Sequence, residues 1–201
     1  MKGRFLIDAT RLLFAASLSL LAACATVGPP AAGRAARNAE LAALTHWRLE
    51  GRIAVQSSAE AFQAGLVWEH EGRQDRVQVS GPLGQGAYSI VLQDDLILVR
   101  DDHGNVRTSR NPATLLRQEL GVAVPLASLR YWVLGIADPG GAGPIPVYDD
   151  QGRLQQLRQA DWVLSYLGFV PAADYDLPQK LLAESRDIKL KLIVDNWVIL
   201  H

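Results

Sequence analysis

Apolar residues alternate with polar ones along most of this chain, and this alternation most limits its fold. Over residues 47–55 every second residue is apolar or glycine, with mostly polar residues between them. A period of two puts alternate side chains on opposite faces of a β-strand, so one face is buried and the other meets water. The pattern predicts six strands up to residue 109 and five more over residues 147–197, with a gap through Pro171 and Pro178.

The period changes between these two groups of strands. Asn111 and Pro112 are typical of a helix start, with Asn as the cap and Pro at the first helical position, and Gly121 ends that helix. A second helix is predicted from Pro125 to Gly135. The apolar faces of both helices need cover, and only the sheet can provide it. Because many sequential antiparallel strands tend to curl or close, the predicted fold is mainly β. It is an open, incomplete antiparallel β-barrel of about eleven strands, with helices covering its concave side.

The N-terminal segment is typical of a secretory signal peptide. Lys2, Arg4 and Arg11 make a basic start, and an apolar run over residues 12–23 ends in small residues. That run is about a dozen residues long, whereas a membrane-spanning helix needs about 20. Residues 1–23 are therefore predicted to be a signal peptide.

The end of this segment, Leu21-Ala22-Ala23-Cys24, resembles a bacterial lipobox. The resemblance implies cleavage before Cys24 and acylation of that cysteine, with palmitate among the expected chains. The alternative is an ordinary signal peptide beside a buried thiol, but Cys24 is the chain's only cysteine and no periodic apolar segment follows it. Residues 24–40 are expected to be a lipidated N-terminus and tether, a short helix is predicted over residues 34–46, and residues 41–201 are expected to form one domain.

Composition excludes some classes of function. A formal net charge of −1 gives no electrostatic reason to expect nucleic-acid binding. With Cys24 used for lipid, no disulfide is available, so packing alone must stabilise the domain. The protein is expected to be a monomer.

Residues typical of catalysis are scattered. The four histidines have no metal-ligand spacing and are expected at the surface or in turns, and the acidic pairs are expected to be solvated turn residues. No nucleophile-elbow motif is present, so neither an enzyme nor a cofactor is predicted. These residues are His46, His70, His103 and His201, and the pairs Asp94-Asp95, Asp101-Asp102 and Asp149-Asp150.

A glycine-rich stretch, Gly81-Pro82-Leu83-Gly84, lies between two predicted strands. It is a poor phosphate-binding loop, because no Lys-Ser or Lys-Thr follows and Pro82 lacks an N–H. Its one large side chain, Leu83, has two possible roles. It could fold back onto the sheet, or it could be an exposed apolar tip that enters a membrane or a partner.

Several aromatic residues fall on predicted strands or on the second helix. They can be core residues, or they can line an apolar cavity, since an open barrel is able to enclose one. The candidates for an acyl-binding cavity are Trp68, Tyr88, Trp132, Trp162 and Tyr166.

Motifs spread over nearly the whole chain resemble the LolB family, the outer-membrane lipoprotein receptors of Gram-negative bacteria. Besides the lipobox, the matching pieces occur in the family's order, and the third is the most specific. They are Gly51-Arg52-Ile53-Ala54, Ser80-Gly81-Pro82-Leu83-Gly84, Pro125-Leu126-Ala127-Ser128-Leu129-Arg130-Tyr131-Trp132-Val133-Leu134-Gly135 and Ile188-Lys189-Leu190-Lys191-Leu192 with Trp197.

This resemblance implies an open half-barrel of eleven strands with helices in its mouth. It implies that the chain accepts lipoproteins from the periplasmic carrier LolA and inserts them into the outer membrane. Acyl chains would bind the concave apolar face, and Leu83 would stand at the tip of a loop that acts at the membrane.

The family's sorting logic, applied to Ala25 after the lipidated cysteine, implies lipid anchoring at the periplasmic face of the outer membrane. Two alternatives remain: a lipid-anchored scaffold of the cell envelope without acyl-chain transfer, and a periplasmic lipid hydrolase using His70 or His103, which the absence of a catalytic triad opposes.

Overall fold

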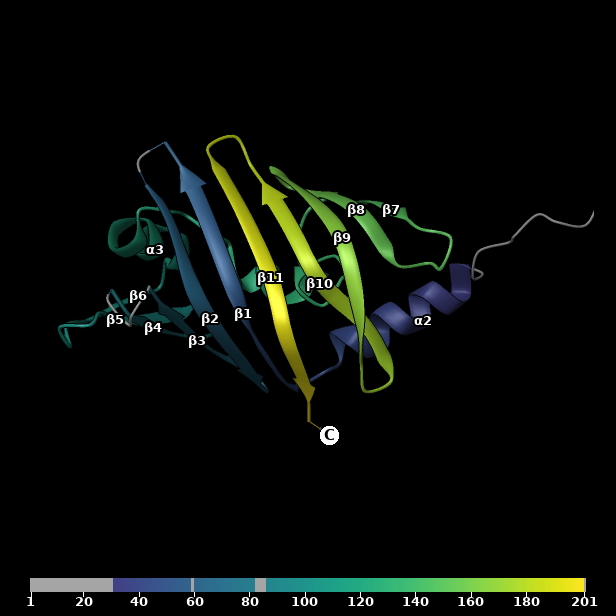
Figure 1. The fold of residues 1–201 in the computed structure, drawn as a ribbon, viewed down its shortest axis with the longest axis horizontal. Helices are drawn as coiled ribbons and strands as arrows, with labels where there is room; N and C mark the ends of the chain where they lie inside the picture. The colour runs from purple at the N-terminus through teal and green to yellow at the C-terminus, as the bar shows by residue number, and fades with distance from the viewer. Residues whose placement is uncertain (1–30, 59, 82–85, 201) are drawn as a thin grey trace, which may run out of the picture.

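The computed structural model describes residues 31–58, 60–81 and 86–200, and they form one antiparallel sheet of eleven strands that does not close (Figure 1). The strand order is β6-β5-β4-β3-β2-β1-β11-β10-β9-β8-β7. Two sequential meanders are therefore joined where the first and last strands pair, and the predicted open barrel is confirmed. The strands are β1 His46–Ser57, β2 Ala61–Glu71, β3 Gln74–Ser80, β4 Tyr88–Gln93, β5 Leu96–Arg100, β6 Val106–Ser109, β7 Ile145–Tyr148, β8 Leu154–Gln159, β9 Trp162–Ala172, β10 Tyr175–Glu184 and β11 Ile188–Ile199.

Three described helices accompany the sheet: α2 Ala31–Ala42, α3 Pro112–Leu120 and α4 Leu126–Trp132. The predicted cap of α3 is confirmed, because Asn111 accepts a hydrogen bond from the Thr114 backbone N–H at 3.2 Å. Helix α3 lies near β5 and β6, at one end of the sheet (Figure 1). Helix α2 lies closer to the N-terminus than the predicted span of 34–46, since His46 already belongs to β1.

Proline did not interrupt the sheet as the sequence suggested, and the predicted gap is wrong. Pro171 lies in β9 opposite Asp176, and Pro178 lies in β10 opposite Phe169. This end of the β9–β10 hairpin extends past the paired parts of β8 and β11, and the register shifts directly after Pro178. A proline destabilises the sheet little at these positions, because no third strand is present there to accept a hydrogen bond from the N–H that proline lacks.

Gly51 marks an irregularity at the centre of the sheet, where the β1–β11 register shifts between Glu50 and Gly51. A Cβ added at this position would lie 2.1 Å from the backbone oxygen of Ile193. Only glycine allows this close approach, which occurs at the junction of the two meanders.

Candidate functional site

An apolar cavity of about 60 Å³ lies between the sheet and helices α3 and α4. Five strands form one side of it. The segment from α3 to α4 forms the other. All of the lining side chains are apolar: Ile53, Val55, Phe62, Leu66, Trp68, Val77, Val79, Ile90 and Leu190 from the strands, and Leu116, Leu120, Val122, Val124, Leu126 and Leu129 from the covering segment.

The cavity is too small, as it stands, for a lipid chain. Pockets for small ligands usually measure about 300–1,000 Å³. The covering segment, residues 116–129, is one continuous stretch of chain, whereas the opposite wall is a hydrogen-bonded sheet. An acyl chain can therefore enter only if the covering segment moves, since moving the sheet would break its ladders.

The five aromatic residues selected from the sequence do not lie together. Only Trp68 lines the cavity. The Trp132 and Trp162 rings pack against each other with centroids 5.9 Å apart, and Tyr166 donates its hydroxyl to the Trp132 backbone oxygen at 3.0 Å. Tyr88 is half-buried at the start of β4. The cavity is lined mainly by aliphatic side chains. In the sequence these residues are the alternating apolar positions of β1, β2 and β3, and that alternation could have identified them.

The aromatic group around Trp132 is held by hydrogen bonds that the sequence did not reveal. Gln159 is buried, and its Oε1 accepts from Trp132 Nε1 at 2.9 Å and from the Asp138 backbone N–H at 3.0 Å. Its Nε2 donates to the Asp138 backbone oxygen at 2.8 Å. Both ends of the amide are thus satisfied, which fixes the C-terminal end of α4 against β8.

A buried charged cluster lies beside the cavity, and it corrects the expectation for His70. That histidine is only 6% exposed, and its Nδ1 lies 2.9 Å from Oδ1 of Asp75, which is fully buried. Trp68 Nε1 donates to the same oxygen at 3.0 Å, and Arg130 of α4 donates through Nε and Nη2 to Oδ2. In the tautomer that carries a proton on Nδ1, His70 donates to this oxygen.

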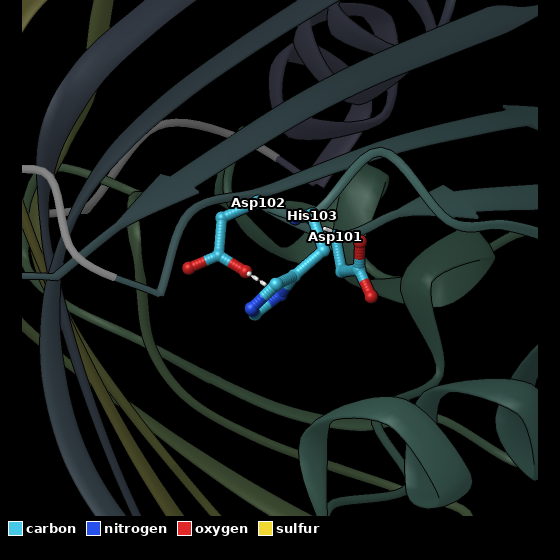
Figure 2. Close-up of side chains that lie close together, drawn as sticks. All are labelled: Asp101, Asp102 and His103. Atoms are coloured by element: carbon cyan, nitrogen blue, oxygen red, sulfur yellow. Dashed lines mark hydrogen bonds and ion pairs between the residues drawn. The ribbon is translucent and has the colours of Figure 1, made fainter.

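Asp101, Asp102 and His103 form the one group of acidic and histidine side chains in the described residues whose possible ligand atoms lie close enough together to hold a metal ion (Figure 2). Asp101 accepts from the backbone N–H groups of His103 and Asn105 and from the Asn105 side chain, and these bonds close the turn. The Asn105 amide holds the pKa of Asp101 below its usual range. Asp102 pairs with His103 at 2.6 Å on the exposed surface. The hydrogen bonds of Asp101 fit the turn position that the sequence predicted for this acidic pair.

The predicted signal peptide lies outside the described residues, and so do Cys24, Ala25, Pro82, Leu83, Gly84 and His201. Gly81 directly follows β3. Among the helices that the structure describes, none combines the length and apolar character that crossing a membrane requires.

The chain is similar to known proteins over most of its length. Residues 45–197 match the family model for the outer membrane lipoprotein LolB. The chain is 34% identical over 188 residues to an outer-membrane lipoprotein LolB of Thiobacillus denitrificans, covering 93% of this chain and 97% of that protein. It is 30% identical to one of Nitrosococcus oceani, covering 90% and 93%. A putative outer membrane lipoprotein-sorting protein domain from Vibrio parahaemolyticus shares the fold, with a TM-score of 0.53 at 10% identity over 82% of this chain and 90% of that one.

Proposed function

The chain belongs to the LolB family of outer-membrane lipoproteins, and from this we propose that it accepts lipoproteins from the periplasmic carrier LolA and inserts them into the outer membrane. The family acts in lipoprotein localisation, so the protein is a receptor and not an enzyme. It works as a monomer, and its ligands are the acyl chains of its lipoprotein cargo.

The apolar cavity is the observation that carries this proposal. Acyl chains leave the carrier, displace the covering segment and occupy the space against Trp68 and the aliphatic strand residues. Burial of each methylene contributes roughly 0.8 kcal/mol, so no cofactor or nucleotide is needed to drive the transfer. The chains then partition into the bilayer, where burial is complete.

Lipidation of Cys24 anchors the receptor at the periplasmic face of the outer membrane. One acyl chain holds a protein to a membrane only marginally, while two or more hold it stably. The supports are the lipobox and Ala25 after the cysteine, a residue that the family's sorting logic associates with the outer membrane.

Delivery uses the loop that contains Leu83. This residue follows Gly81 and Pro82 between β3 and β4, and its leucine side chain suits entry into an apolar phase. In this proposal the cavity binds the acyl chains, the lipid on Cys24 attaches the protein to the membrane, and the Leu83 loop contacts the bilayer during delivery.

A transfer assay tests the proposal. Carrier loaded with a labelled lipoprotein is mixed with the soluble Cys24→Ala protein, and we expect the label to move to it. Val79→Asp places a charge in the cavity lining and should lower acceptance, because an ionised group in an apolar site is costly. Val106→Asp, at an exposed valine of β6, is the matched control and should accept cargo normally.

Circular dichroism must show that both variants are folded. If the folded Cys24→Ala protein takes neither the lipoprotein nor a fluorescent fatty acid, the protein is instead a structural scaffold of the envelope.

A further inference from the structure

The charged cluster around Asp75 has no evident use in binding an apolar chain, yet it adjoins the cavity at two points. Trp68 belongs to both, because its ring lines the cavity while its Nε1 donates to Asp75. Arg130 directly follows Leu129, which lines the cavity from α4. The cluster therefore joins the strand wall of the cavity to its cover.

Arg130, directly after the covering segment, provides a directional contact between α4 and the strand wall of the cavity. The other residues of the cover at this point, Leu126 and Leu129, pack through apolar contacts, which have no preferred direction. Two N–H groups of Arg130 meet Oδ2 of Asp75, and this pair of bonds favours the position of α4 that keeps both. Arg130 is 17% exposed, so water competes with this contact only weakly.

Helix α3 is attached in a different way. Glu119 of α3 pairs with Arg107 of β6 at 2.8 Å, but Arg107 is 63% exposed. Such exposed pairs stabilise little, because solvent screens them. Of these two ion pairs, the one made by Arg130 is therefore the stronger attachment to the strands.

We infer that the Arg130–Asp75 pair is a clasp that positions α4 over the cavity, and that it separates when an acyl chain enters. This inference rests on the proposed function. It makes Arg130 and Asp75 positioning residues, since neither touches the bound chain.

The geometry of the carboxylate makes separation feasible. The clasp engages Oδ2, while Oδ1 accepts from Trp68 and His70, both on β2. When Arg130 withdraws, Asp75 keeps two donors from its own side of the cavity. A buried carboxylate with no remaining partner would oppose opening much more strongly.

Removing the clasp should ease entry. In the soluble Cys24→Ala protein, Arg130→Met keeps most of the side-chain volume and removes the paired N–H groups. A fatty acid whose fluorescence rises in apolar surroundings should bind at least about tenfold faster or tighter than to the parent, because a larger share of molecules is already open. Arg107→Met removes the exposed pair of α3 and should bind like the parent.

General loosening of the fold is a separate explanation, and Leu157→Ala controls for it. Leu157 is fully buried in β8, away from the cavity lining, so this variant should lose stability without binding the probe faster. If Arg130→Met does not fold, Arg130→Lys keeps the charge but loses the two-pronged contact, and should give a smaller acceleration in the same direction.

The parent protein supplies a measurement that needs no variant at the clasp. Arg130 should resist phenylglyoxal, an arginine reagent, when the protein is free, and react once fatty acid saturates the site, as read by mass spectrometry. Equal probe binding by Arg130→Met and the parent, equal acceleration in Leu157→Ala, or an Arg130 that stays protected in the loaded protein would overturn the clasp. A parent that binds no fatty acid would instead contradict the proposed function.

Discussion

The two ends of the barrel interior are built from different chemistry. At the end formed by β1–β4 and α3, mainly aliphatic side chains enclose a void, and their contacts with one another have no preferred direction. At the end formed by β8 and β9, the indole of Trp132, the hydroxyl of Tyr166 and the amide of Gln159 have named hydrogen-bond partners. The aliphatic end can rearrange around a guest of variable shape, whereas the aromatic end must keep one arrangement.

Helix α4 belongs to both ends. Leu126 and Leu129 face the cavity, and Trp132 at the last turn is bonded to Gln159. If the cavity opens, we expect α4 to turn about its C-terminal end, where Trp132 is held. Substitutions at each end test this difference.

The largest effect is expected from Trp132→Ala at the aromatic end. Trp132 is buried, and truncating such a side chain costs about 3–5 kcal/mol of unfolding free energy. Urea denaturation measures this loss. Fatty-acid binding per folded molecule should change little. A folded Trp132→Ala protein that has lost the probe site would show that the aromatic end also binds acyl chains.

Leu116→Ala makes the corresponding change at the aliphatic end. Leu116 is buried in α3 and borders the existing void, so it has fewer contacts to lose, and we expect a cost of about 2–3 kcal/mol. The enlarged cavity should bind the fatty-acid probe more tightly, which titration of the probe measures. Weaker binding would mean that this end is a rigid site and would remove the contrast between the two ends.

Tyr166→Phe removes one hydrogen bond from the aromatic end and leaves the Trp132 carbonyl without it. The expected cost at neutral pH is about 1 kcal/mol. Burial raises the pKa of the Tyr166 hydroxyl, so above pH 10 it ionises in the unfolded chain but not in the folded one. The unfolded state then binds fewer protons, and stability falls as pH rises.

Phenylalanine lacks this effect. The advantage of the parent over Tyr166→Phe should therefore shrink by up to about 1.4 kcal/mol per pH unit above pH 10 and reverse near pH 11. Urea curves at pH 7, 10 and 11 measure it. A constant difference across that range would mean that Tyr166 ionises as easily in the folded protein as in the unfolded one.

The sequence predicted the sheet well because its determinants are local. Alternation along each strand needs no knowledge of its neighbours, and the cap at Asn111 and Gly121 is contained in a few residues. Asp75 was missed because it stands between Gln74 and Arg76 in a polar stretch, and its partner Arg130 is 55 residues away. His70 was misplaced for the same reason. Long-range partners decide whether a polar residue is buried, and a single sequence does not show them.

The candidates for the cavity were chosen because they are aromatic. Residue type alone does not show whether an aromatic side chain lies at the aliphatic or the aromatic end of the barrel interior. Trp68 and Trp132 look alike in sequence, since both stand on apolar faces. One lines the void and the other is bonded to Gln159, which lies 27 residues away. An open barrel predicted that an apolar cavity was possible, but only the packing shows which residues line the cavity and that most of them are aliphatic.

The smallest effect on the fold is expected from Leu83→Glu, which tests whether delivery is separate from both ends of the interior. If Leu83 is the tip that meets the membrane, the substitution should change the free energy of unfolding by less than about 0.5 kcal/mol. A leucine that belonged to the core would behave differently, because even truncation to alanine would cost about 2–5 kcal/mol. One denaturation curve therefore separates the two roles.

The functional half of the test uses liposomes. Leu83→Glu should still take labelled lipoprotein from the carrier, since the cavity is unchanged, but release it slowly into membranes, because an entering leucine gains about 1.5–3 kcal/mol that glutamate cannot. Leu96→Glu is the matched control, as Leu96 is an exposed leucine at the start of β5. Its variant should be equally stable and deliver normally. Delivery by Leu83→Glu at the rate of Leu96→Glu would place the membrane step elsewhere, and the aliphatic end would then have to release its cargo without help from this loop.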